Sequence, residues 1–83
     1  MRIDKFLNAV NITKRRTVAQ DMLQSGVVSI NKLKVKQSKE VKVGDIIEIS
    51  FLDGRLSGYK VLEIPRFKTT PKSDQEKYIE IIN

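Results

Sequence analysis

The sequence predicts an α+β fold, with two N-terminal helices followed by β-hairpins. Apolar residues recur at helical spacing near the N-terminus, and the middle of the chain contains β-prone segments separated by turn residues. A chain of 83 residues can bury one small core but not two. We therefore expect one core domain over residues 1–65 and a C-terminal extension over residues 66–83.

Two helices are predicted before the first strand. The first covers about residues 4–10, and its apolar side chains follow the i, i+3, i+4, i+7 spacing of one helix face: Ile3, Phe6, Leu7 and Val10. The second covers about residues 14–25, with Thr13 as its N-cap and Gly26 in the left-handed position just beyond its end. Asn11 and Ile12 form a short connection between the two helices.

The first hairpin is predicted from strands at residues 27–30 and 33–36 around a tight turn at Asn31 and Lys32. Asparagine tolerates the positive φ that such turns need, and the turn forms only if Lys32 tolerates it as well. Alternation places Leu33 and Val35 on one side of the return strand and three lysines on the other: Lys32, Lys34 and Lys36. These lysines either extend an anion-binding surface or protect an exposed strand edge against aggregation.

The second hairpin is predicted from strands at residues 46–51 and 59–64, which are rich in β-branched and aromatic side chains. A turn at Asp53 and Gly54 joins the two strands. Pro65 ends the hairpin because proline cannot donate a backbone hydrogen bond to a continuing ladder.

The C-terminal extension combines loop, helix and strand signals. Residues 66–72 form a polar connection that we expect to be mobile, and residues 73–76 match a capping box. Residues 78–82 are β-prone. We therefore expect a turn followed by a strand.

Basic residues are concentrated in the N-terminal half of the chain. Residues 1–42 contain ten Lys or Arg and three Asp or Glu, whereas residues 43–83 contain six and seven. The run Lys14-Arg15-Arg16 falls where the second helix should begin, and a helix start already attracts anions. This placement predicts a polyanion-binding surface. Nucleic acid is favoured over an anionic membrane because the first helix has little apolar area.

The composition argues against an enzyme. The chain has no cysteine and no histidine, so it lacks a thiol nucleophile, the commonest metal ligands and the usual physiological-pH base. We expect no catalytic residue, no metal site and no cofactor. The N-terminus has no signal-peptide core and no apolar stretch is long enough to span a membrane, so we expect a cytoplasmic protein.

Four motifs occur in a defined order within about the first 50 residues: Arg2–Leu7, Lys14–Arg16, Gly26–Asn31 and Val43–Asp45. In this order they resemble the RNA-binding domain named after bacterial small-subunit ribosomal protein four. The resemblance implies that the two N-terminal helices pack on a small, bent, mostly antiparallel β-sheet. It also implies that the helix pair and the adjacent hairpin bind structured RNA. The chain departs from the family pattern at Lys32, where glycine is usual, and at Gln37, where many members have proline.

Among stand-alone members of this family, the opening motif and Arg15-Arg16-Thr17 resemble the RqcP proteins and, more distantly, the fifteen-kilodalton bacterial heat-shock proteins. The resemblance implies binding to rRNA and peptidyl-tRNA on large ribosomal subunits. It also implies support of an RqcH-type partner during alanine tailing in the rescue of stalled translation. The alternatives are a ribosome-assembly or heat-shock rRNA-binding protein and a protein-interaction module that acts without RNA. We expect a monomer.

Nine residues are predicted to contact RNA, mainly at phosphates: Arg2, Lys5, Lys14, Arg15, Arg16, Asn31, Lys32, Lys34 and Lys36. Arginine is favoured because its planar guanidinium can bind a phosphate through two N–H groups. Two of the nine have alternative local roles, since Arg2 can pair with Asp4 and Asn31 can serve the turn alone.

Five other polar or aromatic residues are assigned structural roles. The acidic residues Asp4, Asp45 and Asp53 occupy expected cap or turn positions rather than acid–base sites. Tyr59 and Tyr78 could stack on bases, but packing within strands is the favoured interpretation.

Overall fold

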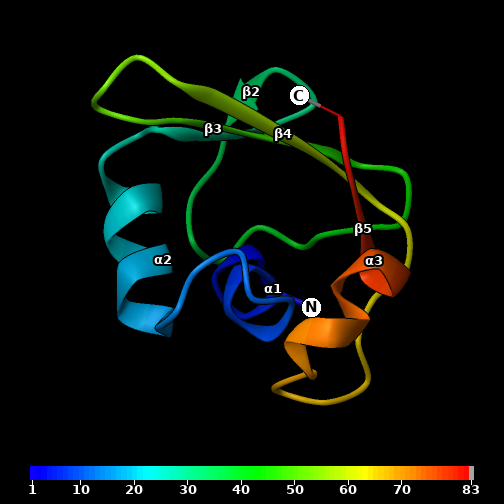
Figure 1. Cartoon of the computed structure of the whole chain (residues 1–83). Helices are drawn as coiled ribbons and strands as arrows, with labels where there is room; N and C mark the ends of the chain where they lie inside the picture. Colours follow the sequence, from blue (N-terminus) through cyan, green and yellow to red (C-terminus); the bar gives the residue numbers. More distant parts are fainter. Residues whose placement is uncertain (83) are drawn as a thin grey trace.

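The computed structural model describes residues 1–82 and places the helices on one face of a β-sheet (Figure 1). Helices α1 (Ile3–Ala9) and α2 (Arg16–Gln24) pack beside each other beneath the sheet. The short helix α3 (Gln75–Tyr78) contacts the end of α1, where the Gln75 side-chain amide donates to the Val10 carbonyl at 2.9 Å. The α+β architecture predicted from the sequence is confirmed.

Within residues 1–82 the sheet has five strands, in the order β2-β1-β3-β4-β5, and every neighbouring pair is antiparallel. Their bounds are β1 (Val28–Ile30), β2 (Leu33–Lys34), β3 (Ile46–Ser50), β4 (Leu56–Val61) and β5 (Ile79–Ile81). Because side chains alternate along a strand, one face of this sheet packs on the helices and the other faces solvent.

The core lies between α1 and the sheet. Ile3, Phe6, Leu7 and Val10, the predicted apolar face of the first helix, are fully buried. They pack with sheet residues that are equally buried: Val28, Ile47, Ile49 and Val61. Helix α2 buries Ala19 and Leu23 of its apolar stripe, Met22 packs partly buried against the core, and Val18 stays 42% exposed. Helix α1 is therefore the central element of the core.

Helix α2 begins two residues later than predicted, and Thr13 is not its N-cap. The helix starts at Arg16, with Arg15 at the N-cap position and no side-chain capping bond. The backbone N–H groups of Ile12 and Thr13 both donate to the Leu7 carbonyl, at 3.0 and 3.1 Å. Thr13 thus completes the C-terminal end of α1 instead of starting α2, and its hydroxyl is buried without a hydrogen-bond partner.

The turn of the first hairpin forms as predicted, with Lys32 in place of the usual glycine. Asn31 and Lys32 have φ values of 51° and 73°, the pair of left-handed conformations that a two-residue type I′ turn requires. Strand β2 is shorter than expected and ends at Lys34, so Lys36 lies beyond it. Leu33 pairs with Ile30 on the helix side of the sheet, yet it is 71% exposed because the edge strand extends past the core.

The second hairpin is tighter than predicted. Its return strand β4 starts at Leu56 rather than residue 59 and leaves the sheet after Val61. The Phe51 N–H donates to the Arg55 carbonyl at 2.8 Å, and the Gly54 N–H donates to the Phe51 carbonyl at 3.0 Å. The positive φ of Gly54, 89°, closes this short turn.

The C-terminal segment joins the same sheet and core. A 3-10 turn (Lys72–Asp74) and α3 lead into β5, which pairs with β4 through Val61 and Ile79. Residues 73–76 do not form the predicted capping box, because neither short helix has a side-chain cap. Tyr78 is 8% exposed and packs in the core. Asn83, the last residue of the expected extension, lies outside the described residues.

Candidate nucleic-acid interface

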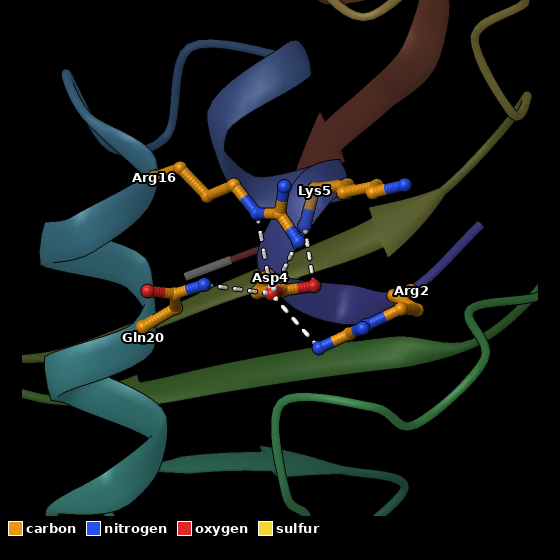
Figure 2. A network of polar contacts seen from close by, with 5 residues as sticks. All are labelled: Arg2, Asp4, Lys5, Arg16 and Gln20. Carbon is orange, nitrogen blue, oxygen red and sulfur yellow. Dashed lines mark hydrogen bonds and ion pairs between the residues drawn. The ribbon is translucent and has the colours of Figure 1, made fainter.

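A buried carboxylate links the two N-terminal helices (Figure 2). Asp4 is fully buried, and its Oδ2 accepts hydrogen bonds from Arg2 Nη2 at 3.3 Å and Gln20 Nε2 at 3.2 Å. The same oxygen accepts from Arg16 Nε and Nη2, at 3.3 and 3.2 Å. Its Oδ1 accepts from the backbone N–H of Lys5 at 2.9 Å. Asp4 therefore holds side chains from both helices around one point.

The Asp4 carboxylate is stabilised in its charged form. Burial raises its pKa, but hydrogen bonds from Gln20, Arg16 and the Lys5 backbone outweigh burial, so the pKa lies below its ordinary value of 3.8. The sequence prediction of a first-turn position is correct, and the role in joining the helices was missed. A signal for it was present, because Asp4 lies three residues before Leu7 and so shares the buried face of α1.

Arg2 and Arg16 are held by Asp4 while part of each guanidinium remains at the surface. Their side chains are 38% and 43% exposed. Arg16 uses Nε and Nη2 to bind Asp4, and its remaining terminal nitrogen points away from the carboxylate in Figure 2. A guanidinium fixed along one edge can present its other N–H groups to a phosphate without first losing side-chain entropy. Arg16 is held in this way through two nitrogens, whereas Arg2 is held through Nη2 alone and its buried Nε has no hydrogen-bond partner within residues 1–82.

Three further predicted cations lie near this pair: Lys5, Lys14 and Arg15. All are exposed, and their side chains form no hydrogen bond or ion pair within residues 1–82. Lys14 and Arg15 precede α2, so only Arg16 of the basic run lies in its first turn. We call Arg2, Lys5, Lys14, Arg15 and Arg16 the helix-pair cluster.

The hairpin lysines do not join the helix-pair cluster. Lys34 pairs with Ser29, which is opposite Glu48, so it lies on the sheet face away from the helices. The Lys32 Nζ lies 3.1 Å from Glu48 Oε1, which neutralises part of its charge. Lys36, beyond the strand, borders a hollow beside the C-terminal end of α2.

A separate groove of about 560 Å³ runs between the first hairpin and the segment that follows it. Lys34 and Lys36 line it, together with Lys39 and Lys42, which the sequence interpretation did not select. Glu40 and Asp45 also line the groove, so it is less positive than the lysines alone indicate. The signal for Lys39 and Lys42 was only the basic composition of the N-terminal half.

Both the nitrogen and the oxygen of the Asn31 side-chain amide form hydrogen bonds. Its Nδ2 donates to Asp45 Oδ1 at 3.1 Å, and its Oδ1 accepts from the Ile46 N–H at 3.0 Å. Asp45 also accepts from the Lys42 N–H at 2.9 Å, and Asp53 accepts from the Arg55 N–H at 3.0 Å, which are the local roles expected of these acids. Asn31 thus ties the hairpin turn to the start of β3.

The described residues contain no group of three or more His, Cys, Asp or Glu side chains that could hold a metal ion. No helix within residues 1–82 has the length and apolar character needed to cross a membrane. Tyr59 in β4 is half-buried against the core, as predicted for strand packing, whereas Tyr78 packs in the core from the end of α3 and not from a strand.

Comparisons with known proteins give a consistent set of similarities. A family model described as S4 domain matches residues 1–47. The chain is 47% identical over 79 residues to a Helicobacter pylori protein named RQC P-site tRNA stabilizing factor, covering 95% of this chain and 93% of that protein. A Streptococcus pneumoniae protein of the same name is 40% identical over 83 residues, covering 100% of this chain and 91% of that protein.

Among solved structures, the fold is similar to that of trimeric heat shock protein 15 from Vibrio cholerae. The TM-score is 0.86, and the superposition covers 98% of this chain and 80% of the other. At 23% sequence identity this likeness concerns the fold alone.

Proposed function

We propose that this chain, which belongs to the S4 domain family, binds rRNA and tRNA on the ribosome in ribosome-associated quality control. Within that family it belongs to the group of RQC P-site tRNA stabilizing factors. The resemblance stated from the sequence motifs is confirmed. The chain is a binding factor and not an enzyme, like the relatives that it matches over most of its length.

The observation that carries the proposal is the helix-pair cluster. Asp4 fixes two guanidinium groups at the surface, and Lys14 and Arg15 add cations that have no partner within residues 1–82. Phosphate groups at fixed positions on folded RNA are the natural counterions for such an arrangement. Recognition by phosphate position suits structured RNA, because the deep groove of an RNA helix hides its base edges from side chains.

The finer part of the proposal concerns the state of the ribosome. We infer that the preferred target is a large subunit that carries peptidyl-tRNA, and that binding there supports an RqcH-type factor during alanine tailing. Such a factor would act in the cytoplasm as a monomer. All nine predicted contact residues stay in the proposal, with the helix-pair cluster as its principal part and the hairpin residues as long-range contributors of affinity: Asn31, Lys32, Lys34 and Lys36.

The test uses the two cations that have no role in the fold. The double variant Lys14→Ala/Arg15→Ala should co-sediment less with large subunits, because it loses two phosphate contacts. The salt dependence of its RNA affinity should become shallower by about 1.5 in log–log slope. The matched control Lys60→Ala/Lys72→Ala removes the same charge from exposed positions outside the cluster and should bind like the wild type. Equal binding by both double variants contradicts the proposed interface.

A comparison of subunits tests the finer part. Wild-type protein should bind large subunits loaded with peptidyl-tRNA more tightly than empty ones. Equal binding to the two would contradict the role in rescue and favour an assembly or heat-shock factor that binds rRNA alone. Association that survives nuclease treatment would instead favour a protein-interaction module.

A further inference from the structure

An exposed four-residue loop, residues 66–69, is fixed between two buried anchors. Pro65 is buried at its start, and Thr70 is 8% exposed at its end. The Thr70 hydroxyl and backbone N–H both donate to the Ala9 carbonyl, at 2.7 and 3.1 Å. The Thr70 carbonyl accepts from Asn11 Nδ2 at 3.0 Å. The loop is therefore held against the C-terminal end of α1, close to the helix-pair cluster.

The loop presents an aromatic ring between two cations. Phe67 is 71% exposed, and Arg66 and Lys68 on either side of it are exposed as well. Within the described part of the chain, neither cation forms a side-chain hydrogen bond or ion pair. Exposed aromatic rings beside backbone-neutralising cations are the recurrent platform for stacking on nucleic-acid bases.

The loop and the helix-pair cluster border one cavity. Lys68 and Thr69 line a hollow of about 310 Å³ together with Met1, Lys5, Asn8 and Arg16. Three of these six side chains are cationic, one is an amide, one is a hydroxyl and none is acidic. The cations come from α1, from the first turn of α2 and from the loop, so the fold has gathered positive charge from distant parts of the sequence.

We propose that residues 66–69 are a second RNA-binding element, in which Phe67 stacks on an unpaired base while Lys68, Lys5 and Arg16 hold an adjacent phosphate. This inference rests on the proposed function, and it specifies the kind of RNA that the site accepts. A base within a regular duplex is already stacked and paired, so its face is not available to Phe67. The loop therefore selects a bulge, a loop or a single-stranded end beside the structured RNA that the helix pair contacts.

A fluorescent substitution tests the stacking directly. The chain contains no tryptophan, so Phe67→Trp provides a single reporter at the proposed stacking position. The control Leu52→Trp lies at the β3–β4 turn, at the opposite end of the molecule in Figure 1, where the native side chain is fully exposed. The RNA probes are a GC-rich hairpin with an oligouridine loop and a blunt duplex with the same stem.

The expected result is saturable quenching of the Phe67→Trp emission by the hairpin, with little change for the duplex or for Leu52→Trp. Phe67→Ala should weaken binding of the looped RNA about tenfold, the loss typical of one aromatic–base stack, and change duplex binding less than about twofold. Its melting temperature should stay that of the wild type, because the ring is exposed. Unchanged Phe67→Trp emission at saturating hairpin, or equal losses for both RNAs, would overturn the inference.

The outcomes separate this inference from the proposed function. If Lys14→Ala/Arg15→Ala loses RNA affinity while Phe67→Trp is not quenched, the helix-pair interface stands and the stacking element fails. If the wild-type protein binds neither RNA and does not co-sediment with large subunits, the proposed function fails with the inference. A spectral shift with anionic phosphatidylglycerol vesicles but no response to RNA would overturn the inference in favour of membrane contact.

Discussion

Replacement of Asp4 by asparagine tests the idea that one buried carboxylate organises the helix-pair cluster. Asparagine keeps the shape of the side chain and can retain the acceptor for the Lys5 N–H. Its amide N–H groups, however, would face donors on Arg2, Arg16 and Gln20 in place of the Oδ2 acceptor. The substitution therefore removes a charge and turns at least one attractive contact into a clash between donors.

The loss of stability in Asp4→Asn depends on how far solvent reaches the side chains that bind Asp4. Hydrogen bonds to a charged group contribute roughly 1.5–3 kcal/mol each when fully desolvated. Arg2 and Arg16 are 38% and 43% exposed, so solvent screens their contributions, and they can turn to water when the carboxylate is lost. We expect Asp4→Asn to lower the free energy of unfolding by about 2–3 kcal/mol. In a domain of this size that corresponds to a fall in melting temperature of about 10–20 °C.

Thermal unfolding followed by circular dichroism measures this change, and Asp21→Asn is the matched control. Asp21 is exposed on α2 and its side chain forms no hydrogen bond or ion pair within residues 1–82, so its substitution should shift the melting temperature by less than about 2 °C. A melting temperature of Asp4→Asn within the same margin would refute the reasoning.

The pH dependence gives a second check on Asp4. Its pKa is lower in the folded protein than its ordinary value of 3.8, so its charge stabilises the fold above that value. This contribution is lost as the pH falls from about 5 through 3.8 toward the folded pKa. The stability gap between wild type and Asp4→Asn should therefore be largest near neutral pH and shrink in acid. A gap that stays constant down to the acid transition would contradict the charge-based account.

Three other substitutions test features of the fold by chemical denaturation. Lys32→Gly should stabilise the protein by about 0.5–1 kcal/mol, because glycine adopts the 73° φ without strain and the exposed ion pair with Glu48 contributes little; a loss of stability would contradict this. Thr70→Val should cost about 1 kcal/mol, since it removes the buried hydroxyl that donates to Ala9, and an unchanged midpoint would argue against that bond. Ile79→Ala should cost about 2–4 kcal/mol, whereas a cost below about 1 kcal/mol would show that β5 is peripheral.

Local patterns were sufficient to predict the first helix and the first hairpin. Ile3, Phe6 and Leu7 are buried, and helical periodicity alone is enough to place them on one face of the helix. The turn at Asn31 and Lys32 depends on backbone preferences of two adjacent residues, and it formed as the sequence indicated.

The features that local patterns missed depend on residues far apart in the sequence. Asp4 meets Arg16 and Gln20 only after the helices pack, so no window along α1 contains its partners. Thr13 does not cap α2, because its backbone N–H joins the end of α1 through the Leu7 carbonyl and α2 begins only at Arg16. The anchoring of residues 66–69 was not predicted, because the hydrogen bond from Thr70 to the Ala9 carbonyl joins residues 61 positions apart.

The central position of α1 makes the two proposed RNA-binding elements parts of one cooperative folding unit. The helix contacts α2 through Asp4, the C-terminal segment through Ala9, and the sheet through its apolar face. Detaching any one of these neighbours would expose the same buried side chains, so a partly unfolded form would have a high free energy. The unfolding transition should therefore be two-state. A destabilising substitution anywhere in this core should therefore lower the fraction of folded protein. In a cell the expected effect is a lower abundance of the intact protein, with no folded form in which only one of the two RNA-binding elements is lost.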